Sequence, residues 1–241
     1  MTRIALDSKG VFRLPSMLHL PRYKNDKGYL VHCLLKILFG DDAPQPFFIE
    51  NDYGRRMTVL GYTSTNPDEL KHEASATADP EIYNIVDWKG LSSKEMPASW
   101  ATGQRYGFQV RACPVIRKAS AGPNFKKGAE VDVFLDACWQ AKNDGENVDR
   151  EEVYVNWLRK QLIQHGEVEL VSAGMLAFKR SPLLRRNHQP KRTSHFCDRP
   201  DVLITGTLQV GDEVAFRQLL KRGIGRHRSF GFGMIMLRRG R

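Results

Sequence analysis

The spacing of apolar positions along the first half of the chain predicts a short series of strands and helices. Apolar residues at alternate positions indicate half-buried strands, and apolar residues three or four apart indicate helices. In chain order we expect a strand within residues 11–20, a helix at about 28–39, strands near 45–50 and 56–63, a short helix near 67–74, and a strand at Ile82–Trp88. This order is βαββαβ.

The second half of the chain has a similar pattern. Tyr106, Phe108 and Val110 alternate with polar residues or glycine, which predicts a strand, and residues 131–135 alternate in the same way. Asp212 has the side chain of a helix N-cap, and glycines are common just after a helix ends. After these two strands we expect, in chain order, a helix at about 150–165 ending at Gly166, strands near 168–178 and 201–210, a helix from Asp212 to Gly223, and a strand at Gly231–Leu237.

Apart from one extra strand, this half is also βαββαβ, which is the order of the ferredoxin-like unit. The sequence thus predicts an α+β protein of tandem ferredoxin-like (RRM-like) βαββαβ domains with a basic cleft. The stretch rich in Ser, Pro and Gly at residues 92–103 is the expected linker. We place an N-terminal domain at residues 1–91 and a C-terminal domain at residues 104–241.

Composition excludes several classes of protein. With 41% apolar and 27% charged residues, the chain resembles an ordinary globular protein. We find no apolar run long enough to span a membrane and no signal peptide, so we expect a cytoplasmic protein that does not bind membranes. The four cysteines form no CxxC pair, so we expect neither a disulfide framework nor a metal site, and no cofactor.

Positive charge is unevenly distributed along the chain. The formal net charge is +10, yet residues 41–100 carry five Lys/Arg against eleven acids. Residues 171–197 contain six Lys/Arg and no acid, and residues 214–241 contain eight and no acid. Long windows without acids favour a face that binds phosphates, although a solvated basic surface is an alternative.

The helix expected at residues 28–39 carries the candidate catalytic side chains. At 100° per residue its leucines share a wide apolar face, while Tyr29, His32, Cys33 and Lys36 fall on the other. A phenol, an imidazole and an ammonium group within two turns could move a proton and stabilise a developing phosphorane without a metal. A polar helix face with an incidental histidine is the alternative.

The tail Gly223-Ile-Gly-Arg-His-Arg-Ser-Phe-Gly-Phe-Gly233 is the clearest motif. It lacks the third glycine of GxGxxG and the GK[ST] of a P-loop, which argues against a mononucleotide site. Glycines allow the backbone to approach a phosphate closely, with cations alongside. Tight packing of a helix against a strand would explain the glycines but not the residues between them. The candidate RNA-binding residues here are Gly225, Arg226, His227, Arg228 and Ser229.

Residues 179–192 are predicted to form a long basic loop, too long for a tight hairpin turn. Its cations could follow RNA phosphates near the end of a stem, because the major groove of A-form RNA is inaccessible. A loop that becomes ordered only on RNA is an open alternative. A metal site at His188, His195 and Cys197 matches no standard zinc spacing. The candidate RNA-binding residues of this loop are Lys179, Arg180, Arg185, Arg186, Lys191 and Arg192.

Four stretches resemble the CasE subfamily of CRISPR-associated repeat-processing endoribonucleases, in the RAMP superfamily. They are Tyr29-Leu-Val-His-Cys-Leu-Leu-Lys-Ile-Leu-Phe39, Tyr106-Gly-Phe-Gln-Val-Arg-Ala-Cys-Pro-Val115, the helix containing Trp157-Leu-Arg-Lys, and the run from Val202 to Gly233. They span most of the chain in the expected order, and the last is the most specific. Two features depart from the family: the long segment at residues 7–27 and the arginine-rich loop.

The resemblance implies metal-independent cleavage at the base of a repeat stem-loop, in which the ribose 2′-oxygen attacks the adjacent phosphate. The products would be a 2′,3′-cyclic phosphate and a 5′-hydroxyl. His32 matches the family's catalytic histidine and Tyr29 its tyrosine partner, and Lys36 lies near a basic residue that some members use. It also implies that the protein keeps the guide RNA and joins other CRISPR proteins in a surveillance complex. A non-catalytic subunit that binds an RNA hairpin, and a DNA-binding protein, remain alternatives.

Overall fold

The computed structural model describes residues 1–19, 26–51, 54–141, 147–186 and 194–239. Contacts between Cα atoms divide the chain into two compact units, each made of more than one segment. Unit 1 comprises Met1–Ala98, Pro182–Cys197 and His227–Met234. Unit 2 comprises Ser99–Ser181, Asp198–Arg226 and Ile235–Arg241.

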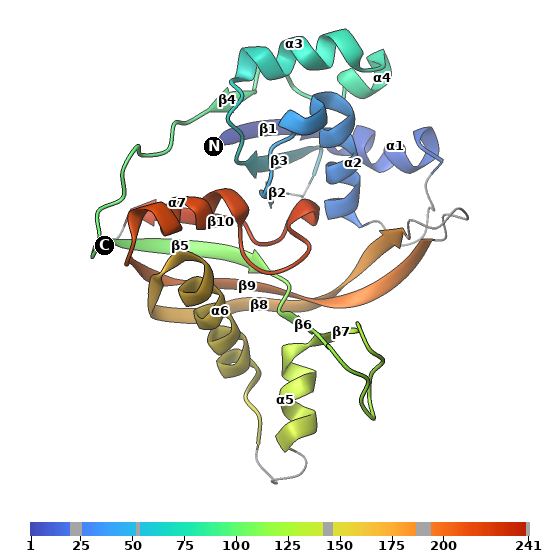
Figure 1. Ribbon diagram of the computed structural model, residues 1–241. Coiled ribbons are helices and arrows are strands. Elements are labelled where there is room, and N and C mark those ends of the chain that lie inside the picture. Colours follow the sequence, from blue (N-terminus) through green and yellow to red (C-terminus); the bar gives the residue numbers. More distant parts are fainter. Residues whose placement is uncertain (20–25, 52–53, 142–146, 187–193, 240–241) are drawn as a thin grey trace. The chain divides into compact units, whose positions relative to one another are not determined.

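Unit 1 is built on a four-stranded sheet with the order β2-β3-β1-β4 (Figure 1). Its paired strands are antiparallel. The strands are β1 (Thr2–Asp7), β2 (Phe47–Asn51), β3 (Arg56–Gly61) and β4 (Ser92–Ser93). The helices are α1 (Ser8–Met17), α2 (Lys27–Phe39), α3 (Pro67–Thr77) and α4 (Pro80–Tyr83), with a 3₁₀ turn η1 at Gly40–Asp42.

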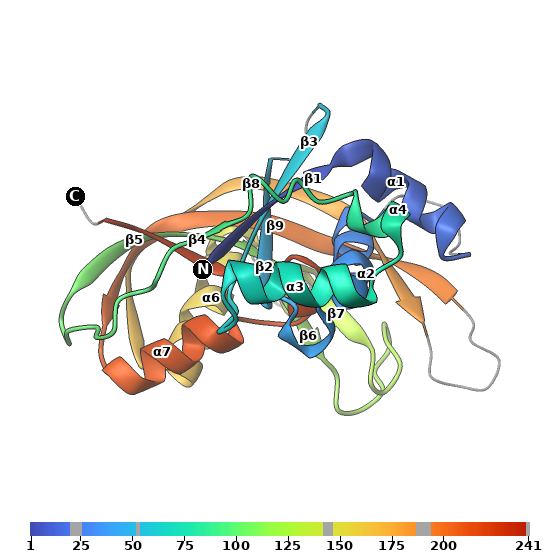
Figure 2. The same cartoon turned by 90° about the horizontal axis from the view of Figure 1, so that it is seen from above.

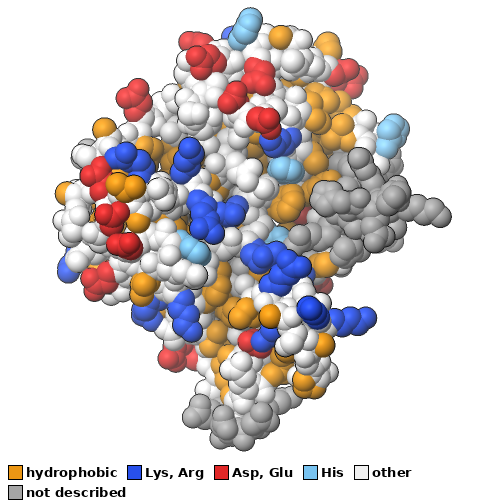
Figure 3. All heavy atoms as spheres, in the orientation of Figure 1, with side chains coloured by type: hydrophobic (Ala, Val, Ile, Leu, Met, Phe, Trp, Pro, Cys, Tyr) orange, Lys and Arg blue, Asp and Glu red, His pale blue; other side chains and the backbone are white. Residues whose placement is uncertain are grey.

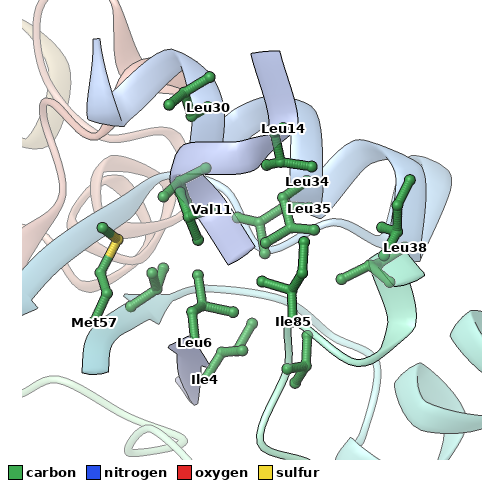
Figure 4. Packing of buried hydrophobic residues seen from close by; sticks show 14 of the residues in the cluster. Ile4, Leu6, Val11, Leu14, Leu30, Leu34, Leu35, Leu38, Met57 and Ile85 are labelled. Atoms are coloured by element: carbon green, nitrogen blue, oxygen red, sulfur yellow. The ribbon is translucent and has the colours of Figure 1, made fainter. Parts of the chain in front are cut away.

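Helix α2 forms where the sequence predicts it, and its apolar face closes the core of unit 1. The Asp26 carboxylate accepts a hydrogen bond from the Tyr29 backbone amide at 3.0 Å, which caps the N-terminus of the helix. Leu34 and Leu35 are almost fully buried, and Figure 4 shows them packed with Ile4 and Leu6 of β1. Burial of these side chains fixes the rotation of α2 about its axis, and so fixes which residues lie on its other side.

Two of the strand predictions for unit 1 are wrong. The strand expected within residues 11–20 is helix α1, which begins after Asp7, whose carboxylate accepts from the Gly10 amide at 2.9 Å. Val11 and Leu14 are three apart and both are fully buried, so the pattern is helical. Residues 82–88 overlap α4 and make one isolated bridge, Leu6 to Val86, instead of a strand. The fourth strand is β4, inside the expected linker.

Unit 2 contains a second sheet with the order β10-β5-β9-β8. Figure 2 shows helices α6 and α7 on one face of it. Its strands are β5 (Arg105–Ala112), β8 (Val168–Arg186), β9 (Ser194–Val210) and β10 (Ile235–Arg239), and its helices are α6 (Arg150–Gly166) and α7 (Glu213–Arg222). The ends of β8 and β9 that lie within Pro182–Cys197 belong to unit 1. Between β5 and α6 the chain inserts β6 (Val115–Arg117), β7 (Glu130–Asp132) and α5 (Val133–Ala141).

Two expectations for this part of the chain also need correction. The strand expected at residues 131–135 ends at Asp132, because its carboxylate accepts from the Phe134 amide at 2.9 Å where α5 begins. The expected basic loop is mostly strand, since β8 continues to Arg186. The rest of that loop, residues 187–193, lies outside the described residues.

Both sheets have the strand order of the ferredoxin-like unit. Numbered by their place within each βαββαβ series, the strands lie in the order 4-1-3-2 in unit 1 and again in unit 2. The predicted α+β fold with two ferredoxin-like units is therefore confirmed. Within the part of the chain that the structure describes, no helix is long and apolar enough to cross a membrane.

Candidate active site

Helix α2 places His32 and Tyr29 against the aromatic ring of Phe230. The His32 imidazole meets this ring edge-on, with 5.2 Å between ring centroids and an interplanar angle of 81°. The Tyr29 ring lies 5.9 Å from the same ring. His32 is half-buried, whereas Tyr29 is only 9% exposed and belongs to the core of unit 1. The phenol expected on an open polar face is therefore largely covered.

Phe230 reaches α2 because the glycine-rich tail folds back in a tight turn. Residues Arg228–Phe230 form a 3₁₀ turn, η2, between His227 at φ 62° and Gly231 at φ 81°, both left-handed. A side chain at Gly28 of α2 would place its Cβ 2.1 Å from the Phe230 carbonyl oxygen. Only glycine at that position lets the turn lie this close to the helix.

A side-chain hydrogen bond also holds the turn in unit 1. Gln45, just before β2, donates from Nε2 to the Ser229 hydroxyl oxygen at 2.8 Å. Within the turn, the Phe230 amide donates to the His227 carbonyl oxygen at 2.8 Å. The imidazole on α2 therefore faces a turn that is fixed by a backbone bond, a side-chain bond and a close helix contact.

Lys36 lies about one turn further along α2 and is directed toward the end of the helix. Its Nζ donates to the Gly40 carbonyl oxygen at 2.8 Å and lies 3.2 Å from the Asp41 carboxylate. Because both partners are exposed, this ion pair is weak, and Lys36 can leave Asp41 for another anion at little cost in free energy. The charge of Lys36 still reaches His32 through space.

The pKa of His32 is lowered from its ordinary value of 6.5. Burial is the larger cause, because it disfavours the charged imidazolium, and the positive charge of Lys36 is the second cause. Both effects favour a neutral ring at neutral pH. A neutral imidazole can accept a proton from a hydroxyl group, which is the first requirement of a general base.

We predict that replacing Lys36 by Gln raises the pKa of His32 in the free protein toward 6.5. Removing a nearby positive charge makes protonation less costly, while the burial of the ring remains. An NMR titration of the His32 ring protons in both proteins measures the difference. An identical or lower pKa in the variant would contradict the electrostatic coupling between the two side chains.

Several acidic residues of unit 1 lie on helices α3 and α4. Figure 3 shows acidic side chains gathered over helices α3 and α4, the uppermost elements of Figure 1. These helices carry Asp68, Glu69, Glu73 and Glu81. Helix α2 contains two lysines and no acid. Helices α1 and α2 are therefore the basic helices of unit 1, each with two cations and no acid.

The tail residues expected to bind RNA fall into both units. In unit 1, His227 is 9% exposed, and its ring centroid lies 6.4 Å from that of Phe230. Arg228 and Ser229 are half-buried in the turn that faces α2. In unit 2, Gly225 adopts φ 67°, and a Cβ there would lie 2.9 Å from the Trp157 ring. Arg226 follows it and pairs with Glu130.

The remaining RNA-binding candidates come from β8 and the segment after it. Lys179 Nζ lies 3.7 Å from the Asp201 carboxylate, and Arg180 Nη1 lies 3.9 Å from that of Asp132. Arg185 and Arg186 belong to β8, but their side chains lie outside the described residues, as do Lys191 and Arg192 entirely.

Several residues that hold the candidate side chains of each unit escaped the sequence interpretation. Phe230 lies in the quoted tail motif, yet nothing in the motif says that it contacts α2. Gln45 and Glu130 have no local signal at all. Among the described residues, no group of three His, Cys, Asp or Glu side chains could hold a metal ion.

The model of the family described as CRISPR associated protein matches residues 1–239. The chain belongs to this family. Among curated protein sequences there is no significant match.

Solved structures similar to this chain cover almost its whole length. A CRISPR endoribonuclease Cse3 bound to a 19-nucleotide RNA is 18% identical, with TM-score 0.65, covering 98% of each chain. The CRISPR-associated protein Cas6e from Escherichia coli K-12 is 15% identical, with TM-score 0.51, covering 99% of this chain and all of that one. A chain of a CRISPR RNA-guided surveillance complex is 14% identical, with TM-score 0.55, covering 98% of each chain. At these identities the likeness shows a shared fold.

Proposed function

We propose that the protein is an endoribonuclease that binds the stem-loop of a CRISPR repeat and cleaves precursor RNA into mature guide RNA. The observation that carries the proposal is His32, a half-buried imidazole with a lowered pKa, set against a fixed turn in a chain of this family. The fold shared with a Cse3 described as an endoribonuclease bound to RNA supports it.

The proposed reaction is a transesterification that needs no metal. His32 takes the proton of the ribose 2′-hydroxyl as the 2′-oxygen forms a bond to phosphorus. The bond from phosphorus to the 5′-oxygen then breaks, that oxygen takes up a proton from water, and the protonated His32 releases its proton to the solvent. The products are a 2′,3′-cyclic phosphate and a 5′-hydroxyl. Tyr29 would orient the 2′-hydroxyl. The Lys36 ammonium group would leave the Asp41 carboxylate and stabilise the negative charge that develops on the phosphate.

Binding would use the basic residues of β8 and of the glycine-rich tail. Contacts with phosphates position an RNA stem and make its affinity depend on salt. The proposed contacts are Lys179, Arg180, Arg185, Arg186, Lys191, Arg192, Gly225, Arg226, His227, Arg228 and Ser229. In this proposal the domain at residues 1–91 supplies the catalytic helix, and the domain at residues 104–241 supplies most of the contacts.

We also propose that the protein remains on its product as a subunit of a guide-RNA surveillance complex with other CRISPR-associated proteins. The likeness to a chain of such a complex supports this partner. A protein that retains the product hairpin would complete a single turnover and then be inhibited by its product.

The experiment that tests the function is incubation with the stem-loop RNA of a CRISPR repeat from the same genome. We expect one cleavage site at the base of the stem, and no cleavage of a hairpin with a scrambled sequence. The alternative is a non-catalytic subunit that binds the hairpin, which the burial of Tyr29 favours. Tight binding without any cleavage would select that alternative, and preference for duplex DNA in competition would contradict both.

A further inference from the structure

Three buried carboxylates in unit 2 contact cations that are candidates for binding RNA. Their side chains are 8%, 3% and 4% exposed for Glu130, Asp132 and Asp201, respectively. Their partners are far more exposed: Arg226 at 43%, Arg180 at 48% and Lys179 at 67%. Each pair therefore joins an interior anion to a cation at the surface.

Of the three carboxylates, Glu130 makes the shortest contact with its exposed cation. Its Oε1 accepts a hydrogen bond from Arg226 Nε at 2.6 Å, and its Oε2 lies 3.4 Å from Arg199 Nη2. Arg199 is 19% exposed, so it lies deeper than Arg226. One carboxylate of β7 thus contacts two arginines that come from other parts of the chain.

The bond to Nε leaves the outer end of Arg226 able to serve a ligand. A guanidinium has five N–H donors, and four of them are on its two terminal amino groups. A carboxylate held at Nε fixes the plane of the guanidinium, and so fixes the direction of those four donors. The backbone before it is fixed as well, since Gly225 lies against Trp157.

We propose that Glu130 is a positioning residue for RNA binding: it holds the Arg226 guanidinium in the orientation that contacts an RNA phosphate. This inference rests on the proposed function. An arginine that is ordered before binding loses less conformational freedom when the phosphate arrives, so the affinity is higher. Glu130 itself is too buried to contact RNA.

The proposal predicts a change in RNA affinity that is opposite in sign to the change expected from net charge alone. Replacing Glu130 by Gln removes a negative charge, which by long-range attraction alone should strengthen binding to RNA. If Glu130 positions Arg226, the same change weakens binding. The conservative amide keeps the size of the side chain and one acceptor oxygen, so it tests the charge-assisted bond without opening a cavity.

The test measures the affinity of the repeat stem-loop RNA by fluorescence anisotropy, in protein that also carries His32→Ala so that the RNA stays intact. We expect Glu130→Gln to raise Kd about 5- to 20-fold, less than the full contribution of a charge-assisted hydrogen bond, because the amide oxygen of Gln can still accept from Arg226 Nε. The slope of log Kd against log salt should fall by roughly 0.7 to 0.9, as for one lost phosphate contact. The matched control is Glu152→Gln, an exposed acid of the same unit, which should leave Kd unchanged or slightly lower.

A double-mutant cycle with Arg226→Ala separates positioning from general damage. In the Arg226→Ala background, Glu130→Gln should have little further effect on Kd. In protein with an active His32, the single-turnover cleavage rate at saturating protein should be unchanged, while the protein concentration that gives half of this rate rises. Unchanged or tighter binding by Glu130→Gln, or a lower melting temperature with unchanged Kd, would overturn the proposal.

The proposed role of Glu130 and the proposed function of the protein are tested by different assays. Cleavage by the unsubstituted protein tests the function, and the difference in Kd between two uncleaving proteins tests Glu130. Cleavage of the repeat together with an unaffected Kd in Glu130→Gln would overturn the inference alone. Failure of the parent protein to bind repeat RNA would overturn both.

Discussion

Replacing His32 by Ala lowers the single-turnover rate of repeat cleavage by about 10²- to 10⁴-fold, the range that a positioned proton-transfer group contributes. The imidazole is the group on α2 whose lowered pKa leaves it neutral at neutral pH, so its loss removes the proton acceptor. Because the side chain is half-buried at the edge of the Phe230 ring, its loss removes little of the core. The rate is measured with excess protein over labelled repeat RNA.

The matched control is His72→Ala, which removes an exposed histidine of α3 in the same unit. We expect its rate and affinity to equal those of the parent protein. Affinity of His32→Ala for the repeat should also remain within a few-fold of the parent. Equal rates for parent and His32→Ala would remove this residue from the mechanism.

The second large effect is expected from Gly28→Ala, which changes no ionisable group. The new Cβ would lie 2.1 Å from the Phe230 carbonyl oxygen, so the turn that faces His32 must move. A displacement of about 1 Å in a catalytic site can cost roughly 100-fold in rate. We expect a loss of that size in the single-turnover rate, with a melting temperature a few degrees lower.

Gly90→Ala is the matched control for this substitution. A Cβ at Gly90 would meet its nearest neighbours at 3.4 and 3.5 Å, which is ordinary contact, in the same unit. Its rate should therefore equal that of the parent. A parental rate in Gly28→Ala would show that the position of the turn does not matter for catalysis.

The sequence predicts those features that depend on residues close together in the chain. Helix α2 is the clearest case, because Asp26 caps its own helix and the leucines that face the core lie within thirteen residues. The same holds for α7, where Asp212 accepts from the Ala215 amide at 2.7 Å. Strand positions also followed from alternation where one face is buried, as in β5.

Features that depend on distant residues could not be predicted. The pairing of β4 with β1 joins residues about ninety positions apart, and its two residues have no apolar pattern. Phe230 contacts Tyr29 and helps to bury it only because the glycine-rich tail folds back onto α2. A helical wheel of α2 alone therefore placed Tyr29 on an exposed face, whereas it is buried.

Charge counting had the same limit. Residues 171–197 contain no acid, which favours a cluster of unpaired cations. In the fold, Lys179 and Arg180 meet Asp201 and Asp132, acids that come from other segments. Local sequence thus shows where cations are concentrated, while the fold decides which anions hold them and how they are oriented.

The most direct test of the account is the identity of the cleavage products formed in EDTA. The unsubstituted protein is incubated with repeat RNA, and both fragments are weighed by mass spectrometry, alongside an RNA with a 2′-deoxy nucleotide at the cleavage site. Attack by the 2′-oxygen with proton transfer by His32 predicts a 2′,3′-cyclic phosphate, a 5′-hydroxyl, and no cleavage of the 2′-deoxy RNA. Cleavage of the 2′-deoxy RNA, or a 3′-hydroxyl and 5′-phosphate made only when a divalent metal is added, would contradict it.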